Sequence, residues 1–192
     1  MIVNTMMFGS GGGGGFINVD YIRFDGANAI ELPFNINSDY KVTVTFDPVE
    51  YVNAQAVLGN RISPMYFQLI QYSNLWYTST GSNETNFTAA LTGKHTYVNN
   101  YNGGNYFDGD EVTSYTPTTV NTPMLIGWRS NGATYFTGKI YYFKIESIST
   151  GDVICELVPK RLLVDNYEAY GLYDTVNRKF YTFSTFTGGY DE

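Results

Sequence analysis

The chain has 192 residues, with 11 Lys plus Arg against 18 Asp plus Glu, so its formal net charge is −7. That sign argues against a nucleic-acid binder, because affinity for phosphates needs clustered Lys and Arg. The chain is 43% hydrophobic and 17% aromatic but only 15% charged, which excludes intrinsic disorder. A chain of this length can bury one well-formed core, and single all-β domains commonly reach about 200–250 residues.

The chain has one cysteine and one histidine, which limits its metal and redox chemistry. Cys155 cannot form an internal disulfide or a Cys-rich zinc site, and His95 leaves no room for a His-rich site. No apolar run approaches the roughly 20 residues of a membrane span. The first ten residues lack the basic and small-residue features of a signal peptide. We expect no cofactor, no metal site, and neither a membrane nor a nucleic acid as partner.

The N-terminal residues 1–15 form a unit of their own in the sequence. The glycine run 11–15 has nothing to pack and great backbone freedom, so it separates a short apolar arm from the rest. One interpretation is a frayed terminus, and the other is an arm that docks on a partner. The anchoring residues of that arm would be its five large apolar side chains: Ile2, Val3, Met6, Met7 and Phe8.

From residue 16 onward the pattern is typical of β-structure. The cleanest strand is Tyr40–Phe46, in which apolar residues alternate with Lys and Thr. In Phe16–Phe24, the alternation predicts Ile17, Val19 and Tyr21 on one face. About a dozen short runs, spaced roughly 8–12 residues apart with turn residues between them, predict a sandwich or barrel. Lys160–Tyr170 is the one stretch that suggests a turn of helix. The other strand-like runs are Ala54–Gly59, Tyr66–Tyr72, Leu75–Thr80, Asn86–Leu91, His95–Asn99, Pro123–Trp128, Gly138–Ile145, Val153–Val158, Gly171–Tyr173 and Lys179–Phe183.

Catalytic motifs are missing from the sequence. The densest acidic group, Asp108–Glu111, falls at a predicted turn, which favours a solvated hairpin over a Ca²⁺ site. No serine motif offers His95 a nucleophile, so we expect a structural or exposed histidine. The apolar surroundings of Cys155 predict a buried, unreactive thiol. We therefore expect that the protein is not an enzyme.

The two tryptophans are candidate platforms for a sugar ring, because a flat aromatic face packs well against sugar C–H groups. Among so many aromatic residues, a tryptophan belongs more often to the core than to a binding site. Trp128 is the better candidate for glycan stacking, since a polar turn follows it directly. Trp76 has no such neighbourhood.

The C-terminal half carries a series of recognisable motifs. Gly138-Lys-Ile-Tyr-Tyr-Phe-Lys-Ile145 is followed by a polar turn over Ser147–Asp152, a strand ending at Pro159, and the block Gly171-Leu-Tyr-Asp174 running on to Tyr181. These motifs resemble the concanavalin A-like lectin/glucanase domains of the laminin-G type that are common in bacteriophage and gut-bacterial structural proteins. Three earlier segments also fit that pattern, and the resemblance then spans Ile17–Tyr181. They are Tyr21–Gly26, Tyr40–Phe46 and Asn105–Gly109.

The resemblance implies a two-sheet antiparallel jelly-roll sandwich over residues 16–192, preceded by the arm and tether of residues 1–15. Hydrolases of this group carry a carboxylate motif that this chain lacks. We therefore expect a non-enzymatic bacteriophage virion structural protein, such as a capsid-decoration, head-fibre or tail-associated subunit. It would be made in the host cytoplasm, present in many copies and anchored to other virion proteins by its arm. The alternative is a carbohydrate-binding, lectin-like adhesion module for host or mucus glycans.

Overall fold

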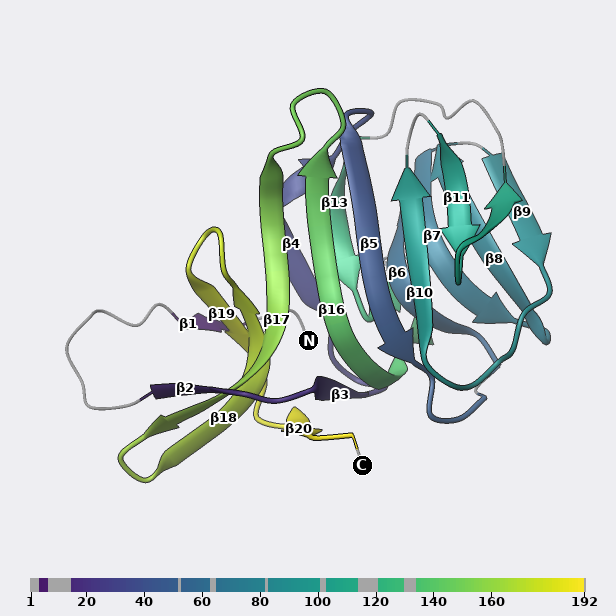
Figure 1. Ribbon diagram of the computed structural model, residues 1–192. Helices are drawn as coiled ribbons and strands as arrows, with labels where there is room; N and C mark the ends of the chain where they lie inside the picture. The colour runs from purple at the N-terminus through teal and green to yellow at the C-terminus, as the bar shows by residue number, and fades with distance from the viewer. Residues whose placement is uncertain are drawn as a thin grey trace.

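The computed structural model describes residues 4–6, 15–51, 53–62, 65–81, 83–100, 103–113, 121–129 and 134–191. Within these ranges the chain forms antiparallel strands and no helix. A large and a small sheet face each other as a jelly-roll-like sandwich (Figure 1). The predicted all-β, two-sheet fold is confirmed.

Among the described residues, twelve strands form the large sheet and six form the small one. The main path of the large sheet is β1 (Asn4–Met6), β19 (Lys179–Thr182), β18 (Tyr167–Asp174), β17 (Val153–Val164), β16 (Thr137–Ser147), β5 (Tyr40–Asp47), β10 (His95–Asn100), β11 (Gly104–Phe107) and β12 (Asp110–Thr113). Three further strands attach beside it: β2 (Gly15–Asn18), β3 (Tyr21–Asp25) and β20 (Thr187–Gly189). The small sheet runs β4 (Ile30–Ile36), β13 (Thr122–Ile126), β6 (Gln55–Ile62), β7 (Met65–Tyr72), β8 (Leu75–Gly81) and β9 (Asn83–Phe87).

The core lies between the two sheets and follows the two-residue period of the strands. Along β5, the inward side chains of Val42, Val44 and Phe46 are fully buried, while Thr43 and Thr45 point to the outer face. Burying one such apolar side chain contributes about 1.5–3 kcal/mol before the entropic cost of ordering the chain. The alternation predicted for Tyr40–Phe46 therefore corresponds to the central strand of the core.

The large sheet divides where β16 and β17 separate. These strands pair directly over Phe143–Glu146, and beyond that point β2 pairs with β17 while β3 pairs with β16. The chain thus changes partner between β2 and β3, and the predicted common face of Ile17, Val19 and Tyr21 is wrong. Ile17 is 40% exposed, whereas Ile22 in β3 is fully buried.

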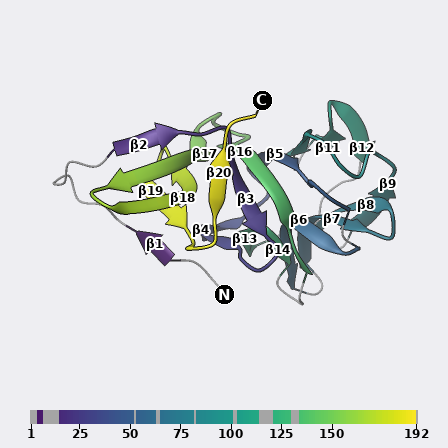
Figure 2. The same ribbon diagram turned by 90° about the horizontal axis from the view of Figure 1, so that it is seen from below.

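The outer parts of β17 and β18 project beyond the small sheet together with β2, β19 and β1 (Figures 1 and 2). We call these projecting strands the wing. Leu162, Ala169 and Phe180 form a second, smaller apolar cluster there, and the Phe16 ring lies 5.1 Å from that of Phe180. The helical turn suggested for Lys160–Tyr170 is wrong, because these residues form the β17–β18 hairpin of the wing.

Candidate functional site

The structure places part of the predicted arm on the edge of the wing. Strand β1 pairs antiparallel with β19 of the same chain, with Asn4 opposite Thr182 and Met6 opposite Phe180. The other four anchoring residues, Ile2, Val3, Met7 and Phe8, lie outside the described residues. The division into residues 1–15 and 16–192 and the attachment to a partner stay predictions.

Trp128, the predicted glycan platform, belongs to a hairpin of β14 (Trp128–Arg129) and β15 (Thr134–Tyr135). Its half-buried ring stacks on Tyr135, with centroids 5.8 Å apart and planes 14° apart, so Tyr135 covers one ring face. Trp76 is fully buried, and its Nε1 donates a hydrogen bond to the carbonyl of Ala90 at 2.9 Å. Trp76 is therefore a core residue, in agreement with the expectation that a tryptophan in so aromatic a chain belongs to the core.

His95 and the acidic turn form one structural unit. The buried His95 ring lies 4.8 Å from the Phe107 ring, and its Nδ1 is 2.7 Å from Asp108 Oδ2. Asp108 and Gly109 both have positive φ at the β11–β12 turn, and Asp108–Glu111 are exposed. The predictions of a structural histidine and a solvated hairpin are confirmed. The described residues contain no group of three or more His, Cys, Asp or Glu side chains arranged to hold a metal ion.

Cys155 is fully buried in β17, and its Sγ lies 3.3 Å from Asp174 Oδ2. Burial raises the pKa of its thiol far above the ordinary value, and the neighbouring Asp174 carboxylate raises it further. A nucleophilic cysteine needs the opposite, an accessible thiolate. The prediction of a buried thiol that packs as a small hydrophobe is therefore confirmed.

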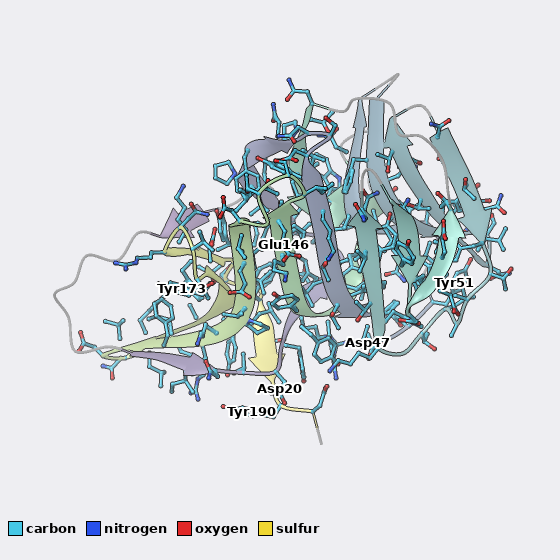
Figure 3. All side chains as sticks on the ribbon, turned by 45° about the horizontal axis from the view of Figure 1, so that its top comes forward. Asp20, Asp47, Tyr51, Glu146, Tyr173 and Tyr190 are labelled. Carbon is cyan, nitrogen blue, oxygen red and sulfur yellow. The ribbon has the colours of Figure 1, made fainter. Side chains whose placement is uncertain are left out.

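A cleft of about 680 Å³ lies on the outer face of the large sheet, where β16 and β17 separate. We call it the fork cleft. Its size falls within the roughly 300–1,000 Å³ of small-molecule sites. Figure 3 labels Asp20 and Tyr190 at this end of the sheet. The polar side chains that line the cleft are Asn18, Asp20, Lys94, Tyr141, Lys160, Thr175 and Asp191.

The segment after β20 crosses the fork cleft and places the carboxylate of Asp191 among cations. Asp191 Oδ1 accepts hydrogen bonds from Lys139 Nζ at 3.0 Å and from the Tyr141 hydroxyl at 3.1 Å. Lys94 Nζ lies 3.6 Å from the other oxygen. The main-chain N–H of Asp191 donates to Asp20 Oδ2 at 2.9 Å, which fixes the position of the segment.

Lysines and tyrosines alternate around this carboxylate. Lys94 Nζ lies 3.8 Å from the centroid of the Tyr141 ring, and Lys139 Nζ lies 4.1 Å from that of Tyr21. The two rings meet edge to face at 5.8 Å. Because an ammonium group is attracted to the face of an aromatic ring, both lysines are oriented before any ligand arrives.

The charge states of the fork cleft follow from these contacts. The hydrogen bond from Lys139 lowers the pKa of Asp191, which stays ionised at neutral pH. Burial tends to lower the pKa of Lys139, but its hydrogen bonds with Asp191 and Tyr141 outweigh burial and raise it. Burial is the largest cause that raises the pKa of Tyr141, and the hydrogen bond to Asp191 adds to it, so that this pKa is about 12. The cleft therefore offers two ammonium groups and a phenol that donates at physiological pH.

The outer face next to the fork cleft is polar as well. The Tyr142 hydroxyl and Thr175 Oγ1 donate to the two oxygens of Glu156, at 2.8 and 2.7 Å. Both hydrogen bonds lower the pKa of Glu156, and the one from Thr175 has the larger effect. On the same face, Lys144 Nζ lies 3.0 Å from Glu146, which Figure 3 labels. Such a surface of donors, acceptors and aromatic rings is suited to binding a polar ligand.

Sequence reasoning missed the fork cleft. The alternation around Ile140 indicates that Lys139 and Tyr141 point outward, but that pattern is equally typical of any solvated strand. No local pattern links them to Lys94, Asp20 or Asp191, which come from three other segments. The fold alone brings these residues together.

The comparisons with known proteins give no family for this chain. None of the models of known protein families matches it, and no curated protein matches it significantly. The fold and the fork cleft define a structural class: an all-β sandwich of two antiparallel sheets with a polar, aromatic cleft on its large sheet. The described residues include no helix long and apolar enough to cross a membrane.

Proposed function

We propose that this chain is a non-enzymatic structural subunit of a multi-copy assembly of the bacteriophage virion type, which displays the sandwich and is anchored by its N-terminal arm. One observation supports the proposal: the backbone of β1 extends a sheet by main-chain pairing, in this structure at the edge strand β19 of its own chain. Strand addition is a common mode of attachment between proteins, because an exposed sheet edge offers unpaired donors and acceptors. The arm therefore has both apolar side chains and a backbone suited to sheet extension.

Many copies on one particle strengthen a weak anchor. A short apolar arm buries little area, at about 25 cal/mol per Å² before the cost of ordering it. When several subunits are held on the same surface, the contacts act together and the assembly stays occupied. The glycine run gives the arm the reach to find its site while the sandwich stays outside.

Deleting residues 1–8 tests this proposal. We expect the shortened protein to keep the circular dichroism of the full chain and a urea unfolding midpoint close to it, because the main core between the sheets is untouched and only the edge pairing of β1 with β19 is lost. Its incorporation into particles, measured by co-sedimentation, is expected to fall at least about tenfold. The substitution Asn4→Ser, which keeps every apolar side chain of the arm, is the matched control. Normal incorporation of the shortened chain would count against the anchoring role.

The fork cleft favours a second function, the binding of glycans. The ring of Tyr141 and the side chains of Val158 and Pro159 give an apolar surface, surrounded by the amide, carboxylate and ammonium groups of the cleft. Sugars bind to such combinations through ring stacking and directional hydrogen bonds. Trp128 gives a competing platform at a different place in the fold.

Three substitutions separate these platforms. If glycans bind in the fork cleft, Tyr141→Ala is expected to weaken binding to the glycans found on an array at least about tenfold, since the ring and its phenol are both lost. Tyr141→Phe keeps the ring and is expected to lose less. Trp128→Leu is expected to leave the affinity unchanged, as isothermal titration calorimetry would show. The reverse pattern would assign binding to the Trp128 hairpin.

A further inference from the structure

We propose that the fork cleft binds a carboxylate-bearing sugar, a uronic acid unit of an acidic polysaccharide, and that Asp191 occupies the carboxylate position when no ligand is bound. The inference rests on the proposed glycan-binding function and names its substrate class. It starts from the groups that hold Asp191: Lys139, Tyr141 and Lys94 converge on one carboxylate from three sides. Charge-assisted hydrogen bonds of this kind are stronger than neutral ones.

The charge of the fork cleft points to an anionic ligand. Lys94 and Lys160 line it and Lys139 pairs with Asp191, so three ammonium groups outnumber the carboxylate of Asp20 once Asp191 leaves. The chain as a whole has a net charge of −7, so a positive cleft stands out against its surface. A carboxylate from solution would meet the same three donors that now hold Asp191, with no rearrangement of the sheet. A neutral sugar would leave two lysines without a counter-charge.

The contacts of the Asp191 side chain are suited to displacement, while the main chain of the segment stays held. The Tyr190 hydroxyl donates to the carbonyl of Asn18 and the Asp191 N–H donates to Asp20 Oδ2, both at 2.9 Å, and neither bond involves the Asp191 carboxylate. The side chain of Asp191 is itself 37% exposed. Exposed ion pairs contribute little to stability, so an incoming carboxylate with further contacts in the cleft can replace this one.

The surroundings favour a sugar over an acidic peptide. An extended peptide binds best to an unpaired strand edge. At the fork cleft both edges of β3 are occupied, one by β16 and the other by β20. What stays available is a cleft with an aromatic ring, a proline and separate polar side chains, which suits a ring-shaped ligand with several hydroxyl groups.

Calorimetric titration tests the inference with defined probes: trimers of galacturonic acid and of mannuronic acid, each beside its neutral counterpart, the galactose and mannose trimers. Asp191→Asn removes the competing charge, so we expect it to bind at least one acidic trimer about tenfold more tightly than the natural chain does. Its affinity for the neutral trimers is expected to stay the same. Lys139→Ala is expected to lose the acidic trimer, because the central donor is gone.

Asp152→Asn is the matched control, since it removes one negative charge from an exposed turn outside the fork cleft. An equal gain from Asp152→Asn would mean a general effect of net charge and would overturn the inference. So would unchanged binding of both acidic trimers in Asp191→Asn. Neutral trimers that bind in a Tyr141-dependent manner, without preference for acid, would overturn only the inference and leave glycan binding intact. The absence of binding to any trimer and to any array glycan would overturn both.

Discussion

Replacing Asp174 with alanine is expected to lower the free energy of unfolding by about 3 kcal/mol, which corresponds to a fall in Tm of about 6–12 °C for a domain of this size. The side chain is fully buried where β18 ends. Its Oδ1 accepts the main-chain N–H groups of Val176 and Asn177, both at 3.0 Å. Its Oδ2 accepts the Asn177 side-chain amide at 2.8 Å.

Alanine would remove the acceptor of the main-chain N–H groups of Val176 and Asn177, while the Asn177 amide would keep its hydrogen bond to the Ile154 carbonyl at 3.1 Å. The turn between β18 and β19 would lose the group around which it is built. Urea unfolding followed by tryptophan fluorescence measures the difference. Asp174→Asn keeps an acceptor oxygen and the size of the side chain, so a smaller loss is expected, about 1–2 kcal/mol. Asp152→Ala, on an exposed turn, is expected to change stability by less than about 0.5 kcal/mol. Equal values for Asp174→Ala and Asp152→Ala would show that the turn does not depend on this carboxylate.

The sequence predicts much of the fold because most strands follow a simple alternation. Strand β4 shows where that reasoning failed. Ile30, Leu32 and Ile36 alternate with polar residues and are buried, but Pro33 interrupts the pattern and no strand was predicted there. In the structure β4 is the edge strand of the small sheet, where a residue without an N–H is tolerated.

Composition rules also misplace some polar residues. Asparagine is typical of turns, because its side chain hydrogen-bonds to the local backbone. Asn99 and Asn105 instead point inward between the sheets, where their side-chain amides donate to Thr80 at 2.7 Å and to Thr78 at 2.9 Å. The hydrogen bonds that allow such burial come from β8 on the opposite sheet. Local sequence contains no information about that partner strand.

The same reason explains the fork cleft. Lys139 and Tyr141 belong to a motif that indicates a resemblance, but their role depends on Lys94 and Asp191, about 45 and 50 residues away in the chain. By contrast, the reactive residue types were predictable, because His95 and Cys155 occur once each, no serine motif offers His95 a nucleophile, and Cys155 has apolar neighbours. The sequence thus indicates which of these residues are buried. Only the structure shows which residues meet at the surface.

Gly171→Ala is expected to destabilise the protein by about 3 kcal/mol, because a methyl group has no room in this part of the sheet. A Cβ at Gly171 would lie 2.3 Å from the main-chain oxygen of Tyr181 and 2.8 Å from the Phe180 ring. The backbone of β19 cannot move away without breaking its pairing with β18. Thermal unfolding measures the effect, and Gly15→Ala, in a strand with open space around the Cβ position, is the matched control with almost no expected change.

The double substitution Gly171→Ala with Phe180→Leu identifies which neighbour is responsible. Leucine removes the ring but leaves the Tyr181 carbonyl where it is, so we expect the double variant to be no more stable than Gly171→Ala. A double variant as stable as the natural chain would instead assign the clash to the ring alone. Either result bears on the block Gly171-Leu-Tyr-Asp174, whose glycine makes room for a neighbouring strand and whose aspartate holds a turn. Both roles belong to the architecture of the sandwich, so this block is informative about fold, and the function has to be sought in the arm and the fork cleft.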